Sequence, residues 1–228
     1  MQYIPKNNVA PNTWESWFTK ATGERSYDYG RDYSSLTNLT EAKKYLIAEQ
    51  HELCAYCQTS INTTNASIEH VIPKELNKEL STNYHNLVVV CKSQLKDIHT
   101  DRLHCDKEKA NLLLTPFLFA ADSDVTGTKN NAYFAAYADG TITARTALND
   151  NMKAEVDAFI EILNLNHSAL KQRRAKDVLN GLIEAFRSVP MHQKNTFWRI
   201  QFQRILNNKK QPYRQYLLIY IGNRIGIN

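Results

Sequence analysis

The stretch that decides the fold runs from Cys54 to Lys74 and reads CAYCQTSINTTNASIEHVIPK. It opens with two cysteines separated by two residues, a spacing typical of a metal-binding knuckle. It closes with a carboxylate and a histidine side by side, Glu69 and His70, in an apolar frame that ends at Pro73. The stretch therefore places metal-ligand chemistry directly before a candidate acid–base pair.

The chain contains four cysteines, and the other two are Cys91 and Cys105. A tetrahedral zinc site takes four nitrogen or sulfur ligands, so all four cysteines are candidate ligands. Thirteen residues separate Cys91 from Cys105, so the intervening segment must loop out for them to meet. His99 or His104 could replace one cysteine, and Cys91 could instead be a small buried residue. No βαβ pattern surrounds the first pair, which disfavours a thioredoxin-like redox site.

The residues around the knuckle predict short elements. A helix is expected from Asn38 or Thr40 to about Leu53. Residues 67–72 predict a strand that Pro73 ends, and residues 87–90 predict a second apolar strand. Alternation along a strand points neighbouring side chains to opposite faces, so the pair 69–70 needs a twist or bulge near Pro73 to reach one site. A helix is expected to follow Cys105.

The second half of the chain has a different pattern. Residues 131–145 alternate around Asp139-Gly140, which predicts a β-hairpin. Apolar residues at helical spacing predict a helix over 152–163, another capped by Asn166 or Ser168, and helical stretches around 191–206 and 213–220. The second of these helices is expected to expose a basic face opposite its apolar one. That face would carry Lys171, Arg173, Arg174 and Lys176.

Charge is unevenly distributed along the 228 residues. Residues 163–228 carry a net charge of +10 and the preceding residues −5, for a formal total of +5. A concentrated basic segment favours contact with polyanions such as nucleic acid, although it could also be a set of solvated helix faces. The N-terminal sequence has no apolar secretion signal and no apolar run is long enough to span a membrane, so a cytoplasmic protein is expected.

The order of the motifs resembles that of the HNH nucleases. In this chain it reads C-A-Y-C, then I-E-H-V-I-P-K, then Y-H-N-L-V-V-V-C, then H-C-D-K-E-K, over about residues 54–111. LLLTPF, the ADG hairpin and EILNLNHSALKQRR further resemble the HNH subunit of Septu-type anti-phage systems, which also occurs beside retrons. The resemblance implies an α+β fold, with a zinc-stapled ββα-metal core followed by a hairpin and a mostly helical region.

The resemblance also implies roles for individual residues. His70 would be the general base, and Asn86 would hold the loop and orient this histidine. Glu69 would be the first ligand of a catalytic metal ion. The last ligand position normally holds His or Asn and here holds Asp106, with His104 as a rival. Carboxylate oxygens suit Mg²⁺ or Mn²⁺. Each residue also has a plainer interpretation: Asn86 as a turn residue and Asp106 as a helix cap. Lys109, Arg173 and Arg174 are candidate phosphate contacts.

Three segments are expected: an N-terminal arm over 1–37, a nuclease core over 38–115, and a hairpin with basic helices over 116–228. By resemblance, the chain would be the nucleic-acid-cleaving effector of a defence system. Its partner would be an ATPase subunit of the same system. In retron-associated systems, a retron reverse transcriptase and its DNA would be further partners. DNA is the default substrate, with RNA such as tRNA as an alternative. A non-catalytic zinc-stapled binding module is a further alternative.

Overall fold

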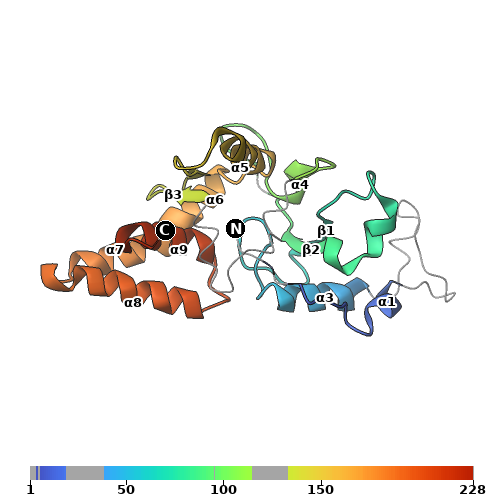
Figure 1. Ribbon diagram of the computed structural model, residues 1–228, viewed down its shortest axis with the longest axis horizontal. Coiled ribbons are helices and arrows are strands. Elements are labelled where there is room, and N and C mark those ends of the chain that lie inside the picture. The colour runs from blue at the N-terminus through green and yellow to red at the C-terminus, as the bar shows by residue number, and fades with distance from the viewer. Residues whose placement is uncertain (1–3, 5, 19–38, 95, 115–132, 228) are drawn as a thin grey trace.

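The computed structural model describes residues 4, 6–18, 39–94, 96–114 and 133–227. These residues form an elongated molecule, with the elements of residues 39–109 toward one end and helices α7 and α8 at the other (Figure 1). Residues 19–37 of the expected arm over 1–37, and the expected boundary between the core and the hairpin region, lie outside the described residues. None of the helices in the described ranges is long and apolar enough to cross a membrane.

A two-stranded antiparallel sheet forms the centre of the first half. It pairs β1 (Ala66–His70) with β2 (Leu87–Cys91) in a register that sets Ala66 opposite Cys91 and His70 opposite Leu87. β2 is buried along its whole length, which explains its uninterrupted apolar sequence. The strands predicted from the sequence are confirmed, although β1 ends at His70, two residues earlier than predicted.

Helix α3 (Leu39–Glu49) packs against β2. The side chain of Gln50 joins the two, because its amide donates to Val89 O at 2.7 Å and its carbonyl accepts from Val89 N at 2.7 Å. The helix ends four residues before the predicted end. His51 and Glu52 have positive φ angles of 56° and 64°, which turn the chain out of the helix. The short α1 (Trp14–Trp17) packs on α3.

Short helical turns connect the strands to the last cysteine. The 3₁₀ turns η2 (Lys78–Thr82) and η3 (Tyr84–Asn86) lie between β1 and β2. Helix α4 (Asp106–Lys109) follows Cys105 and is shorter than predicted. Cys105 and Ala110 bound it with positive φ angles of 57° and 47°. The helix is one turn long and serves to set Asp106 and Lys109 near β1.

The second half contains a hairpin and a series of helices. The predicted hairpin is confirmed as β3 (Phe134–Ala136) paired antiparallel with β4 (Ile142–Ala144). The helical elements are α5 (Asp150–Ile162), α6 (Ser168–Gln172), the π-helical η5 (Arg173–Leu179), α7 (Asn180–Arg187), η6 (Met191–Gln193), α8 (Lys194–Asn207) and α9 (Arg214–Ile225). α8 and α9 pack against each other, and α9 also contacts β3.

Two details of α6 and η5 differ from the sequence prediction. The cap of α6 is His167, whose Nδ1 accepts from Ala169 N at 3.1 Å, and not Asn166 or Ser168. Arg174 is 3% exposed, and its guanidinium donates to Gly140 O and Leu165 O. It therefore does not lie on the exposed basic face, because the π-helical register turns it inward.

The two halves share one continuous hydrophobic core. The start of the C-terminal helix also binds Gln58, the residue after the knuckle: Tyr213 N donates to Gln58 O at 3.0 Å, and Gln215 N donates to the side-chain Oε1 of Gln58 at 2.9 Å. At the other side of the knuckle, Cys105 N donates to Leu163 O at 2.9 Å. The helical half thus closes around the cysteines. Tyr213, just before α9, and Tyr216, Leu217 and Tyr220 within it are buried.

We expect Gly140→Ala to lower the free energy of unfolding by at least about 2 kcal/mol. Gly140 has a φ of +87°, and an added Cβ would lie 2.1 Å from the carbonyl oxygen of Lys171, a backbone atom that cannot move aside. Gly181 is a matched control, because it lies in α7 with no atom within 4 Å of an added Cβ. Gly181→Ala should raise stability by about 0.5–1 kcal/mol in urea unfolding. Equal effects of the two changes would contradict the packing of the hairpin on α6.

Candidate metal centre and active site

The knuckle, residues 54–57, is a tight turn stabilised by backbone hydrogen bonds with the residues that follow it. Cys54 N donates to Thr59 O at 2.9 Å, and Gln58 N donates to Cys54 O at 3.0 Å, with Gln58 at a φ of 64°. Ala55 N donates to Val89 O at 3.1 Å, which ties the turn to β2. Cys91 N donates to Cys54 Sγ at 3.3 Å. The turn and the end of β2 therefore bring three thiols to one place.

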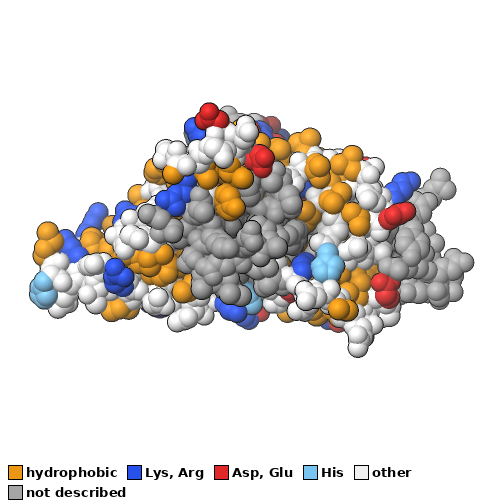
Figure 2. Space-filling view, in the orientation of Figure 1, with side chains coloured by type: hydrophobic (Ala, Val, Ile, Leu, Met, Phe, Trp, Pro, Cys, Tyr) orange, Lys and Arg blue, Asp and Glu red, His pale blue; other side chains and the backbone are white. Residues whose placement is uncertain are grey.

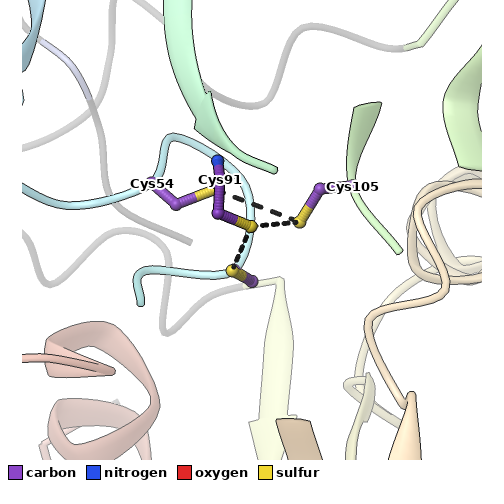
Figure 3. Close-up of side chains that lie close together, drawn as sticks. Cys54, Cys91 and Cys105 are labelled. Atoms are coloured by element: carbon purple, nitrogen blue, oxygen red, sulfur yellow. Dashed lines mark hydrogen bonds between the residues drawn. The ribbon is translucent and has the colours of Figure 1, made fainter. Parts of the chain in front are cut away.

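The four cysteines meet in a buried cluster, and Figure 3 shows Cys91 lying between Cys54 and Cys105. The sulfur–sulfur distances are 3.6 Å from Cys57 to Cys91, 3.8 Å from Cys91 to Cys105 and 4.0 Å from Cys54 to Cys105. A zinc ion bound tetrahedrally by four thiolates at about 2.3 Å needs sulfur–sulfur separations of about 3.8 Å. A disulfide would need about 2.05 Å. The cluster therefore fits a structural zinc ion, as predicted, and four sulfurs complete the ligand set.

Asp97 holds the long segment between Cys91 and Cys105 in place through its hydrogen bonds. Its backbone bonds to Arg102 O and Asp101 N, and its carboxylate accepts from the amides of His99 and Ser168. His99 is exposed, so it lies away from the cluster. His104 is adjacent, with Nδ1 3.2 Å from Cys105 Sγ. Its position suits a hydrogen bond to a thiolate more than replacement of one of the four sulfurs.

A second site lies at the end of β1. A pocket of about 270 Å³ is lined by Glu69 and His70 from the strand end, the segment after Pro73, and Asp106 and Lys109 from α4. Both members of the pair line this pocket, although both lie in β1 and are paired with Val88 and Leu87 of β2. His70 is the last residue of the strand. The residues expected to hold a catalytic metal therefore share one cavity with the expected base.

Glu69 is 6% exposed and bonded to two donors. The hydroxyl of Tyr56 donates to Oε1 at 3.1 Å, and the ammonium of Lys109 lies 2.7 Å from the same oxygen. Burial raises the pKa of Glu69 to about 7, Lys109 lowers it in opposition, and the neighbouring carboxyl of Asp106 raises it further. The carboxyl groups of Glu69 and Asp106 repel each other when both are ionised. A cation bound between them would remove that repulsion.

The ring of His70 is held by a backbone carbonyl. Its Nε2 lies 2.9 Å from Ser81 O, and the residue is 7% exposed. Burial lowers the pKa of His70 to about 4, although the bond to Ser81 O favours the protonated ring. A carbonyl only accepts, so Nε2 carries the proton and Nδ1 is the basic nitrogen of the neutral ring. The ring is thus arranged to accept a proton at neutral pH.

Asn86 holds the loop between the strands. Its Oδ1 accepts from Ile72 N at 2.8 Å, and its Nδ2 donates to Ile72 O at 3.0 Å and to Leu80 O at 3.2 Å. Its backbone carbonyl accepts from Val71 N at 2.9 Å. The side chain therefore joins the end of β1 to η2, whose Ser81 carbonyl contacts His70. Asn86 acts on the pocket through these contacts and does not line it.

The remaining predicted contacts are placed differently. Lys109 is 1% exposed, and its ammonium donates to His70 O at 2.9 Å as well as to Glu69. Its ammonium is therefore bound by two protein groups at the wall of the pocket. Arg173 is exposed, and Arg174 is buried in the second half. Tyr56 was missed by sequence reasoning. The available signal was its position between two ligand cysteines, which forces it inward, but nothing in the sequence connected it to Glu69.

Comparisons with known proteins agree with this geometry at a distance. No protein-family model matches the chain. Part of the chain is similar to a protein of Vibrio cholerae serotype O1 biovar El Tor described as "Retron Vc95 putative HNH endonuclease", with 28% identity over 133 residues. The similar region makes up 57% of this chain and 59% of the relative, so the chain covers less than two thirds of the relative's length. The similarity supports a distant relationship to HNH endonucleases.

Proposed function

We propose that the chain is a metal-dependent HNH endonuclease that hydrolyses phosphodiester bonds in nucleic acid. The observation that carries the proposal is the meeting of Glu69, His70 and Asp106 around one pocket. Asn86 secures the loop behind them. The similarity to a protein described as an HNH endonuclease points to the same chemistry. A binding module would have no need of a basic histidine nitrogen and two carboxyl groups in one cavity.

The roles follow from the chemistry of the side chains. His70, with Nδ1 as its basic nitrogen, takes the proton of the attacking water. Glu69 and Asp106 offer hard oxygen ligands and would hold Mg²⁺ or Mn²⁺. Such an ion, when bound, relieves the negative charge that develops on the phosphate and the leaving oxygen. The four cysteines would hold a structural Zn²⁺ that stabilises the hairpin carrying these residues.

The biological context of the proposal is anti-phage defence. The relative belongs by its description to a retron, and the sequence motifs resemble the HNH subunit of Septu-type systems. We infer an ATPase subunit as partner, together with a retron reverse transcriptase and its DNA where the system contains them. Lysine and arginine side chains lie over the end that carries α7 and α8 (Figure 2), where they suit contact with a polyanion. Exposed examples are Lys176, Arg187, Arg199 and Arg204.

DNA is the proposed substrate, and the test is to map cleavage in cells. The chain would be expressed with its operon neighbours under phage infection, beside a His70→Ala copy and a His99→Ala copy as the matched control. New 5′ and 3′ ends would be sequenced in DNA and in RNA. We expect new DNA ends in wild type and His99→Ala that are missing in His70→Ala. Ends confined to RNA would make the enzyme a ribonuclease, and ends independent of His70 in both pools would refute the proposed site.

A further inference from the structure

Two buried Tyr–Glu–Lys clusters in this protein have the same composition and different geometry. The first joins Tyr84, Glu49 and Lys6, and the second joins Tyr56, Glu69 and Lys109. In both clusters, a tyrosine hydroxyl and a lysine ammonium bind one glutamate carboxylate in a largely buried setting. The first lies beside α3, and its residues do not line the pocket at the end of β1. It provides an internal reference for the second.

In the reference cluster the two donors divide the carboxylate between them. The hydroxyl of Tyr84 donates to Oε1 of Glu49, and the ammonium of Lys6 binds Oε2 at 2.6 Å. Both oxygens of Glu49 are thereby engaged within the protein. A carboxylate bound in this way is held at both oxygens by protein donors and stabilises the packing of its neighbours.

In the second cluster both donors bind the same oxygen. Tyr56 and Lys109 are both directed at Oε1 of Glu69, at 3.1 Å and 2.7 Å. Glu69 lines the pocket, and the carboxyl group of Asp106 beside it lines the pocket too. Oε2 is therefore the oxygen that remains for Asp106 and for a ligand in the cavity. Because two donors hold Oε1 in place, they also set the direction in which Oε2 points.

We propose that Tyr56 is a positioning residue: together with Lys109 it fixes Oε1 of Glu69 and so presents Oε2 to a divalent cation shared with Asp106. This inference rests on the proposed nuclease function. Tyr56 lies between two of the clustered cysteines, and Lys109 lies on the helix that follows the last one. The hydroxyl of Tyr56 thus couples the zinc knuckle to the catalytic carboxylate.

The test variant is Tyr56→Phe, which removes one hydroxyl and keeps the buried ring. Lys109→Met is unsuitable, because it would leave a buried carboxylate without its counter-charge and could unfold the protein. Tyr84→Phe is the matched control, because it removes the same hydroxyl–carboxylate bond at Glu49, outside the pocket. Binding of Mn²⁺ to the zinc-loaded full chain would be followed by electron paramagnetic resonance of the free ion. Zinc content and thermal melting would be measured in parallel.

We expect Tyr56→Phe to weaken Mn²⁺ binding about tenfold, with one zinc per chain retained. The Mn²⁺ concentration for half-maximal cleavage should rise by the same factor, with the maximal rate at saturating Mn²⁺ little changed. Tyr84→Phe should leave both values at those of wild type. Unchanged Mn²⁺ affinity in Tyr56→Phe, an equal loss in Tyr84→Phe, or no Mn²⁺ binding by wild type would overturn the positioning role. Cleavage by His70→Ala at the wild-type rate would instead overturn the proposed function.

Discussion

His70→Ala is expected to lower the rate of phosphodiester cleavage at least about 10²-fold, while the protein stays folded. The substitution removes the proposed proton acceptor, Nδ1, together with the bond from Nε2 to Ser81 O. The cost to folding should be small, because Asn86 holds the surrounding loop by separate contacts. Cleavage would be measured on the substrate identified by end mapping, at saturating Mg²⁺.

Two further variants separate loss of the base from loss of structure. His70→Gln retains an amide that can donate toward Ser81 O but has no basic nitrogen, so it should be as inactive as His70→Ala. His99→Ala removes an exposed histidine and should cleave like wild type. Melting curves and zinc content of all three variants should match those of wild type. A folded His70→Ala or His70→Gln that cleaves within a few fold of wild type would show that another group accepts the proton.

Cys54→Ser should release the zinc ion and destabilise the whole chain. The sulfur of Cys54 lies 4.0 Å from that of Cys105, in a cluster whose ligand atoms all lie within 4.8 Å of one another, and it also accepts from Cys91 N. Binding of zinc to such sites contributes directly to the free energy of folding. A loss of about 5 kcal/mol corresponds to a fall of about 10–20 °C in Tm for a chain of this size. Metal analysis should give well under one zinc per chain.

Ala55→Ser is the matched control for this prediction. It also places a serine hydroxyl in the buried knuckle, but it removes no thiolate. Its cost should be limited to a hydroxyl in a buried position, about 1–3 kcal/mol, with one zinc per chain retained. Full zinc content and a wild-type melting temperature in Cys54→Ser would refute a zinc site of four thiolates.

The parts of the fold that were predictable from sequence are those that local patterns specify. Alternation and Asp139-Gly140 indicated the second hairpin, and the knuckle spacing indicated the cysteine cluster. The position of Arg174 was not predictable in this way. A basic run read at α-helical period predicts an exposed side chain, but the π-helical turn changes the period and two backbone carbonyls, Gly140 O and Leu165 O, bind the guanidinium. Both partners are distant contacts that no local pattern contains.

In the candidate site, too, some residues could be selected from the sequence and others only from the three-dimensional structure. Glu69, His70 and Asp106 were selected from motif order, and the structure places them around one pocket. Strand alternation argued against a shared site for the first two, yet both line the pocket at the end of β1. The roles of Tyr56 and Lys109 depend on which oxygen of Glu69 they bind. That choice is made by packing across the knuckle, β1 and α4, so only three-dimensional geometry could reveal it.

The contacts of the C-terminal half with the knuckle have a consequence for synthesis of the chain. A ribosome that has translated the first 105 residues has delivered every cysteine, but not the Leu163 carbonyl that Cys105 N binds. The backbone and side chain of Gln58 bind Tyr213 and Gln215, and Gln215 is made 157 residues after Gln58. A nascent chain or a shortened fragment therefore lacks the clamps that fix the knuckle. Under the proposed function, cleavage activity would become available only after the helical half has been translated.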